Sequence, residues 1–167
     1  MSWSQVRYRV GQLLRQARAQ VKPQEYRLVE EALSPAQAEM FKGMPLASQR
    51  HSLDVYHALR QRPEADDELL KAALLHDVGK RGVGLHHRVA NVILCALAPG
   101  LWRRWANPGP GPLRHGLYAL RYHGEMGARR LVEVGESPQV TEIVRRHQKE
   151  DDHDPRLRLF REIDEAN

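Results

Sequence analysis

The segment Leu69–Leu75 constrains the fold more than any other part of the chain, because a helix built from it is apolar on nearly every side. A helix of that kind has to be surrounded by other elements, whereas a surface helix keeps one polar face. Asp66 is suited to capping its start, and glycine commonly ends a helix. The sequence therefore predicts a central core helix over about 67–78, with Gly79 as its C-terminal cap.

The rest of the chain also shows helical rather than strand patterns. An amphipathic stripe runs from Val6 to Val21, and proline or a capping residue marks several later starts, including the capping box Ser34-Pro35-Ala36-Gln37. Further helices are expected after Pro45 and from about Leu85, Leu113, Gly124, Ser137 and Pro155. We predict an all-α globular helical bundle that forms a single domain over residues 1–167, with residues 1–45 as a helical extension packed on it.

Composition and charge indicate in which cellular compartment the chain functions and what kind of partner it binds. The 167 residues contain one cysteine, Cys95, so no intramolecular disulfide can form and a reducing compartment fits. The N-terminus lacks the apolar stretch of a secretory signal, and no segment reaches membrane-spanning length, so we expect a cytoplasmic protein.

The net charge is +5, with nine Lys or Arg but only one acid, Glu125, between Lys80 and Arg130. This basic region could be a phosphate-attracting rim, a nucleic-acid face or a solvated surface.

Several histidines and aspartates fall on inward or terminal positions of the expected helices. His147 shares an apolar helical face with Val140 and Val144, and Asp164 shares one with Leu157 and Phe160. A buried carboxylate without a partner is costly. A shared cation would neutralise the acids and bind the imidazole nitrogens at the same time. Such a cation would explain why these polar residues face the interior: His51, His76, Asp77, His123, His147 and Asp164.

The order of these residues resembles a known pattern. His51, the pair His76-Asp77 and Asp164 resemble the H…HD…D signature of the HD-domain metal-dependent phosphohydrolase superfamily, over about residues 49–167. The segment from His123 to Ala128, followed by His147, is similar to the ligand segments of members that hold two metals, such as HD-GYP phosphodiesterases and diadenosine tetraphosphate hydrolases. The Gly-Tyr-Pro signature is absent after His147, which argues against cyclic-di-GMP as substrate.

The resemblance implies a bundle of the HD-domain type and a set of residue roles. His51, His76, Asp77 and Asp164 would bind a first metal, and His123 and His147 a second, with Asp77 bridging. Asp77 and Lys80 would be catalytic, and Lys80 would hold phosphate oxygens. Candidates for a surrounding phosphate rim are Arg81, Arg88, Arg114, Arg121 and Arg129.

Mixed imidazole and carboxylate ligands favour one or two divalent transition-metal ions, Fe, Mn, Zn, Ni or Co, over Mg or Ca. The expected partner is a small phosphorylated substrate, with a nucleotide favoured over nucleic acid. The expected reaction is hydrolysis of that phosphoester.

Three other functions stay open at this stage. The chain could be a metal-bound HD module that binds or senses a nucleotide with little turnover. It could be a basic nucleic-acid-associated protein that uses Trp102, Trp105, Tyr118 and Tyr122 for stacking, or it could bind a membrane interface through residues 85–105.

The remaining histidines are interpreted as structural or solvated, and they are His57, His86, His87 and His115. Glu125 is a candidate partner of an imidazole. The second His-Asp pair, His153-Asp154, is interpreted as a loop whose Asp154 caps a helix.

Overall fold

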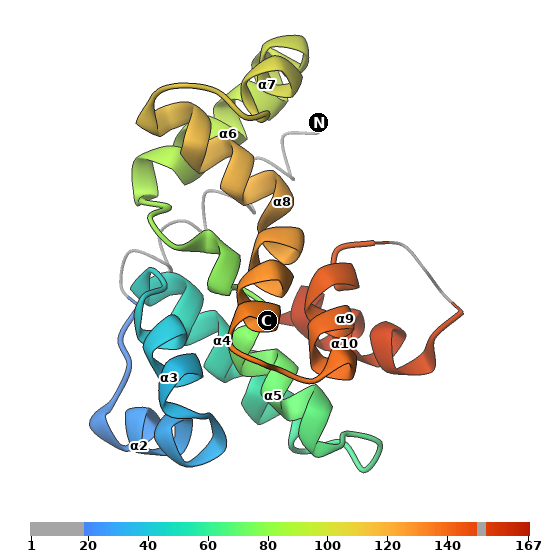
Figure 1. Ribbon diagram of the computed structural model, residues 1–167. Coiled ribbons are helices and arrows are strands. Elements are labelled where there is room, and N and C mark those ends of the chain that lie inside the picture. Colours follow the sequence, from blue (N-terminus) through green and yellow to red (C-terminus); the bar gives the residue numbers. More distant parts are fainter. Residues whose placement is uncertain (1–18, 150–152) are drawn as a thin grey trace.

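Helix α5 (Asp67–Leu75) lies in the interior of the computed structural model, which describes residues 19–149 and 153–167 (Figure 1). Helices α3, α4, α9 and α10 all contact it. Leu69, Ala72, Ala73, Leu74 and Leu75 have no solvent exposure. The prediction that this apolar helix forms the centre of the core is confirmed.

The described residues form α-helices and one short 3-10 helix, with no strand among them, so the predicted all-α class is confirmed. The expected helix over residues 6–21 falls almost entirely outside the described residues. Besides α5, the elements are α2 (Pro23–Ala32), α3 (Pro35–Lys42), α4 (Leu46–Leu59), η1 (Val78–Lys80), α6 (Leu85–Leu97), α7 (Pro99–Trp105), α8 (Pro112–Glu133), α9 (Pro138–Arg146) and α10 (Pro155–Ala166).

The predicted helix starts agree with the structure where a side chain supplies the cap. The side chains of Ser34, Asp66, Ser137 and Asp154 each accept a hydrogen bond from a backbone N–H in the first turn of the helix that follows. Each bond satisfies a donor that the helix itself leaves without a partner. Helix α7 was not expected, and its start is marked only by Pro99.

The end of α5 differs from the prediction. The helix stops at Leu75, and Gly79 belongs to η1 with a negative φ, so it is not a left-handed C-cap. The His76 ring ends the helix instead, because its Nδ1 donates to the carbonyl of Ala73 over 2.9 Å. Gly79 has another role: a Cβ added there would lie 2.0 Å from the carbonyl oxygen of His123. Glycine is required because η1 and α8 approach this closely.

Helix α8 spans the two helices that were expected on either side of Tyr122. Tyr122 has non-helical angles, with φ −121° and ψ 19°, and it kinks α8 directly before His123. Arg121 lies over the rings of Trp102 and Tyr122, at 5.2 and 5.0 Å from their centroids. The kink places His123 at the end of one helical segment and the start of the next.

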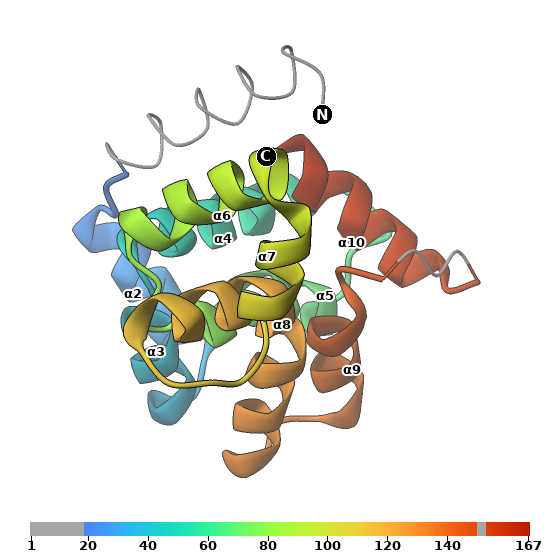
Figure 2. The same cartoon turned by 90° about the horizontal axis from the view of Figure 1, so that it is seen from above.

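Helix α6 is half-buried, which lies within the expectation of a buried or half-buried helix from Leu85 to Ala98. His87 is its one fully buried residue, and Leu85, Val89, Ile93 and Leu97 are exposed. Figure 2 shows α6 along the outer edge of the bundle, where it contacts α7 and α8. Within the described part of the chain, no helix is both long and apolar enough to cross a bilayer.

Candidate metal centre

The ends of three helical segments converge on one buried point. His76 follows α5, His123 follows the kink in α8, and His147 follows α9, and all three side chains are nearly inaccessible to solvent. Asp77 lies among them, also buried. Two groups of ligand atoms, each within 4.8 Å of one another, could hold a metal ion: His51, His76 and Asp77 in the first, and Asp77, His123 and His147 in the second. The two groups share Asp77.

Backbone carbonyls fix the orientation of the three buried imidazoles. In each ring Nδ1 donates to the carbonyl three residues earlier, which a helix end leaves without an intrahelical partner. For His76, His123 and His147 these carbonyls belong to Ala73, Leu120 and Val144, at 2.9, 3.1 and 2.7 Å. A carbonyl can only accept, so Nδ1 carries the proton in each ring. The neutral rings therefore point an Nε2 lone pair at the centre, as metal-binding histidines do.

The spacing of the inward atoms suits a common cation. The Nε2 atoms of His123 and His147 lie 3.2 Å apart, and Oδ1 of Asp77 lies 3.4 Å from Nε2 of both His76 and His123. Two ligands bound at about 2.1 Å to one tetrahedral ion are about 3.4 Å apart. Nε2 of His76 and Oδ1 of Asp77 are buried and form no hydrogen bond of proper geometry. Buried polar atoms rarely stay unsatisfied, so the residues fit a bound ion.

Asp164 and His51 close the more accessible side of the centre. Oδ1 of Asp164 lies 2.7 Å from Nε2 of His51 and 3.4 Å from Nε2 of His76. Both side chains keep 20 to 25 % of their surface exposed, unlike the buried ligands behind them. Burial would raise the pKa of Asp164, but the neighbouring His76 and the hydrogen bond from His51 lower that pKa well below its usual range. Solvent therefore reaches the centre along this edge.

Asp77, His123 and His147 have the protonation states that metal binding requires. Burial would raise the pKa of Asp77, but Lys80 and the surrounding imidazoles hold that pKa well below its ordinary value. Burial lowers the pKa of His147 to about 4, and the proximity of His76 adds to the effect. Burial and the charge of Lys80 likewise lower the pKa of His123. At neutral pH Asp77 and Asp164 are therefore ionised, and His123 and His147 are neutral.

Lys80 supplies the positive charge nearest to Asp77. Its ammonium donates to Oδ2 over 2.9 Å and lies 2.7 Å from Oδ1. Arg130, which sequence reasoning did not single out, donates to the Val78 carbonyl over 3.0 Å and so attaches η1 to α8. No local signal marks Arg130, because its acceptor is 52 residues away in the chain.

The five arginines predicted to surround the site differ in position. Arg88 is the one whose charge interacts with Asp77; burial lowers its pKa, the carboxylate opposes that change, and the guanidinium donates to Ser48 over 2.8 Å. Arg81 is exposed. The remaining three have contacts of their own: Arg114 with the Pro108 carbonyl, Arg121 with the rings of Trp102 and Tyr122, and Arg129 with Glu125.

The other candidate polar residues lie outside the centre. His57 is half exposed and lies 3.9 Å from Glu25. His87 accepts from the backbone N–H of Gly84 and contacts the Pro112 carbonyl, as a residue at a helix start does. Glu125 pairs with Arg129 and Arg145. Asp154 caps α10, as predicted for the second His-Asp pair.

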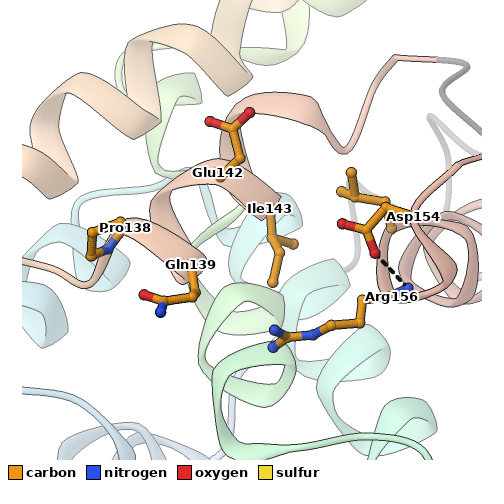
Figure 3. A pocket seen from close by; sticks show the side chains of 7 residues that line it. Pro138, Gln139, Glu142, Ile143, Asp154 and Arg156 are labelled. Carbon is orange, nitrogen blue, oxygen red and sulfur yellow. Dashed lines mark hydrogen bonds between the residues drawn. The ribbon is translucent and has the colours of Figure 1, made fainter.

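A pocket of about 400 Å³ between α9 and the start of α10 is separate from this centre (Figure 3). Figure 3 shows Gln139 and Glu142 on one side and Asp154 and Arg156 on the other. Arg156 pairs with Asp66 and Glu68, so its charge is already compensated. None of the predicted metal ligands lines this pocket.

Comparison with known proteins adds no relative. No protein-family model matches the chain, and neither a curated protein nor a solved structure shows significant similarity to it. What is established is an all-helical fold with a buried cluster of histidines and aspartates that could hold a metal ion.

Proposed function

We propose that the protein is a metal-dependent phosphohydrolase of the HD-domain type that cleaves a nucleotide or another small phosphoester. One observation carries the proposal: two groups of inward-facing ligand atoms meet at a single buried carboxylate, Asp77. Pairs of metal ions that share a carboxylate are a recurrent arrangement for phosphoester chemistry. Imidazole and carboxylate ligands together favour Fe, Mn, Co, Ni or Zn over Mg or Ca.

The contacts support the proposed ligand roles. His51, His76, Asp77 and Asp164 would hold one ion, and His123 and His147 would hold a second, with Asp77 common to both. When bound, such ions provide a hydrolytic nucleophile at neutral pH and polarise the phosphoryl group. The backbone carbonyls behind His76, His123 and His147 keep the rings in the tautomer that can bind metal.

Lys80 and Arg88 are the cations best placed to bind the substrate phosphate. The Lys80 ammonium contacts both oxygens of Asp77. A metal ion on Asp77 would compete for that carboxylate and free the ammonium for a phosphate oxygen. Arg88 is partly buried and lies close enough to Asp77 for the two charges to interact. Arg81, Arg114, Arg121 and Arg129 would contribute at longer range, and the single cysteine fits a cytoplasmic setting.

Metal analysis and turnover test the proposal in sequence. The purified protein, reconstituted separately with Mn, Fe, Co, Ni and Zn, should bind one to two ions per chain by plasma mass spectrometry. The loaded protein should hydrolyse bis-p-nitrophenyl phosphate or a member of a nucleotide panel. Asp77→Ala should abolish both properties, whereas Asp67→Ala, at an exposed position on α5, should keep both.

The possible results discriminate among the functions. Metal binding and nucleotide binding without turnover would indicate a sensing module instead of an enzyme. A folded protein that binds none of the five metals would exclude both the metal-dependent hydrolase and the metal-bound sensing module. Binding to nucleic acid that weakens steeply with salt, without any phosphoester turnover, would support the nucleic-acid function.

A further inference from the structure

A line of exposed apolar side chains follows helix α6. Leu85, Val89, Ile93 and Leu97 succeed one another at intervals of four residues, and they are 50, 38, 49 and 81 % exposed. Leu101 at the start of α7, the next helix, is 38 % exposed. We call these five side chains the α6–α7 face. Aliphatic residues aligned along one helix face indicate a binding partner, whereas scattered ones are ordinary surface.

The charge around this face selects the kind of partner. From Arg81 to Gly124 the chain contains six arginines and no acidic residue. Two of them, Arg103 and Arg104, are exposed on α7, the helix that follows α6 and contacts it. An apolar line bordered by cations fits a partner with a hydrocarbon interior and an anionic surface.

The rigid placement of α7 supports the same partner. Nε1 of Trp102 donates to Oδ1 of Asn91 over 2.7 Å, which ties α7 to α6. Trp102 and Trp105 are both partly exposed. Tryptophan is enriched at the boundary between lipid headgroups and acyl chains, where an apolar ring with one polar edge is favoured.

Other partners that could cover the α6–α7 face are a second copy of the chain, residues 1–18 and nucleic acid, and each fits it less well. A second copy docked through the same face would bring two sets of arginines together. Residues 1–18 contain four arginines and no acid, so their charge has the same sign as that of the face. Nucleic acid would satisfy the arginines but would leave the aliphatic line against phosphates.

We infer that the α6–α7 face binds the surface of a bilayer that contains anionic lipids, with α6 lying in the plane of the interface. The inference does not depend on the proposed hydrolase activity. The inner side of α6 carries His87 and Arg88, which face the protein and leave the outer line free to contact lipid.

Vesicle co-sedimentation of the full chain tests the inference. Vesicles of phosphatidylcholine with one quarter phosphatidylglycerol should bind the protein at least tenfold more tightly than vesicles of phosphatidylcholine alone. Ile93→Glu with Leu97→Glu should lower binding at least tenfold. Val132→Glu is the matched control, since Val132 is an exposed apolar residue, 58 % accessible, at the far end of α8. It should bind as the wild type does.

A second pair of variants tests the electrostatic part. Arg103→Ser with Arg104→Ser should weaken binding to the anionic vesicles several-fold, whereas Arg27→Ser with Arg60→Ser, at exposed positions on α2 and after α4, should not. Circular dichroism verifies that all variants keep the wild-type helix content. The inference is overturned if the wild type ignores anionic vesicles, or if the glutamate variant binds them normally. It is also overturned if light scattering shows a dimer that the glutamate variant dissociates.

Discussion

The Nε2 atoms of His123 and His147 lie 3.2 Å apart, yet neither can donate a hydrogen bond to the other. Both rings already use their single proton at Nδ1, on the carbonyls of Leu120 and Val144. Protonating a second nitrogen is opposed, because the pKa of each ring is lowered, mainly by burial. Two lone pairs facing each other inside a protein are unfavourable unless a cation lies between them.

Replacing His147 should therefore remove one metal ion without removing the other. If the protein is loaded with two ions, His147→Ala should hold one, because the group formed by His51, His76 and Asp77 is unchanged. Plasma mass spectrometry of the reconstituted proteins measures the ratio. His57→Ala, on a half-exposed ring of α4, should keep the wild-type content. An unchanged metal content in His147→Ala would contradict the second site.

Metal binding should stabilise the fold through Asp77. An ion that binds only the folded state adds about 2.7 kcal/mol at a concentration one hundred times its Kd. For a chain of this size that corresponds to a rise in Tm of roughly 5 to 10 °C. Differential scanning fluorimetry with and without a chelator measures the shift. Asp77→Ala should show no metal-dependent rise, and a rise equal to that of the wild type would refute the role of Asp77.

The metal-free protein should lose stability below about pH 6.5. An unfolded histidine takes up a proton near that pH, whereas folded His147 does so only near pH 4, so acidification favours the unfolded chain. For His147 this amounts to about 2 kcal/mol between pH 7 and pH 5, and His123 acts in the same direction. The aspartates, whose pKa values are lowered, lose their contribution only at more acidic pH. Urea unfolding at several pH values measures the slope.

The variant His147→Gln should flatten that slope, because the residue that titrates differently in the two states is gone. His57→Gln replaces a half-exposed histidine outside the centre and serves as the matched control for the substitution itself. Equal slopes in the wild type and in His147→Gln would show that another group causes the pH dependence.

The sequence predicted the parts of the structure that rest on neighbouring residues. The caps at Ser34, Asp66, Ser137 and Asp154 are local hydrogen bonds, and each is where its motif placed it. The predicted end of α5 was wrong. Glycine is a common signal for the end of a helix, whereas a histidine whose ring donates to a backbone carbonyl has no recognisable sequence signal. The half-buried state of α6 was within the expectation, but which of its side chains stay exposed was not predictable, because apolar content does not say which side of a helix has something to pack against.

The candidate centre was predicted as a set of residues but not as an arrangement. The spacing of His51, His76, Asp77 and Asp164 suggested ligands, and these side chains do lie together. The partners of Glu125 were not predictable, because Arg145 comes from another helix. The contact of Gly79 with the His123 carbonyl likewise depends on how η1 docks on α8. Contacts between residues distant in sequence decide these details.

Gly79→Ala should damage the centre without touching a ligand. The new Cβ would lie 2.0 Å from the backbone oxygen of His123, and neither η1 nor the kink in α8 can move without displacing Asp77 or His123. Overpacking of this kind costs about 1 to 3 kcal/mol. Metal affinity should fall together with stability, as seen by urea unfolding and competition with a chelator. Gly100→Ala, with open space around it, should preserve both. Wild-type metal affinity in Gly79→Ala would show that this contact does not position the ligands.

Lys80→Met should separate metal binding from turnover. The Lys80 ammonium lies 2.7 Å from Oδ1 of Asp77, so in the metal-free protein it compensates a buried carboxylate. Its loss should destabilise that form by roughly 3 to 5 kcal/mol, and added metal should restore the stability, because the ion takes over the compensation.

Metal affinity of Lys80→Met should equal or exceed that of the wild type, since no ammonium competes for Asp77. Turnover should fall about tenfold to one-hundredfold, the cost of losing one charge-assisted hydrogen bond to phosphate. Chelator competition and steady-state kinetics measure the two quantities, with Lys42→Met, an exposed lysine paired with Glu30, as the matched control. If Lys80→Met instead binds metal more weakly and keeps wild-type turnover of the loaded protein, then Lys80 supports the ligand Asp77 and does not hold the substrate.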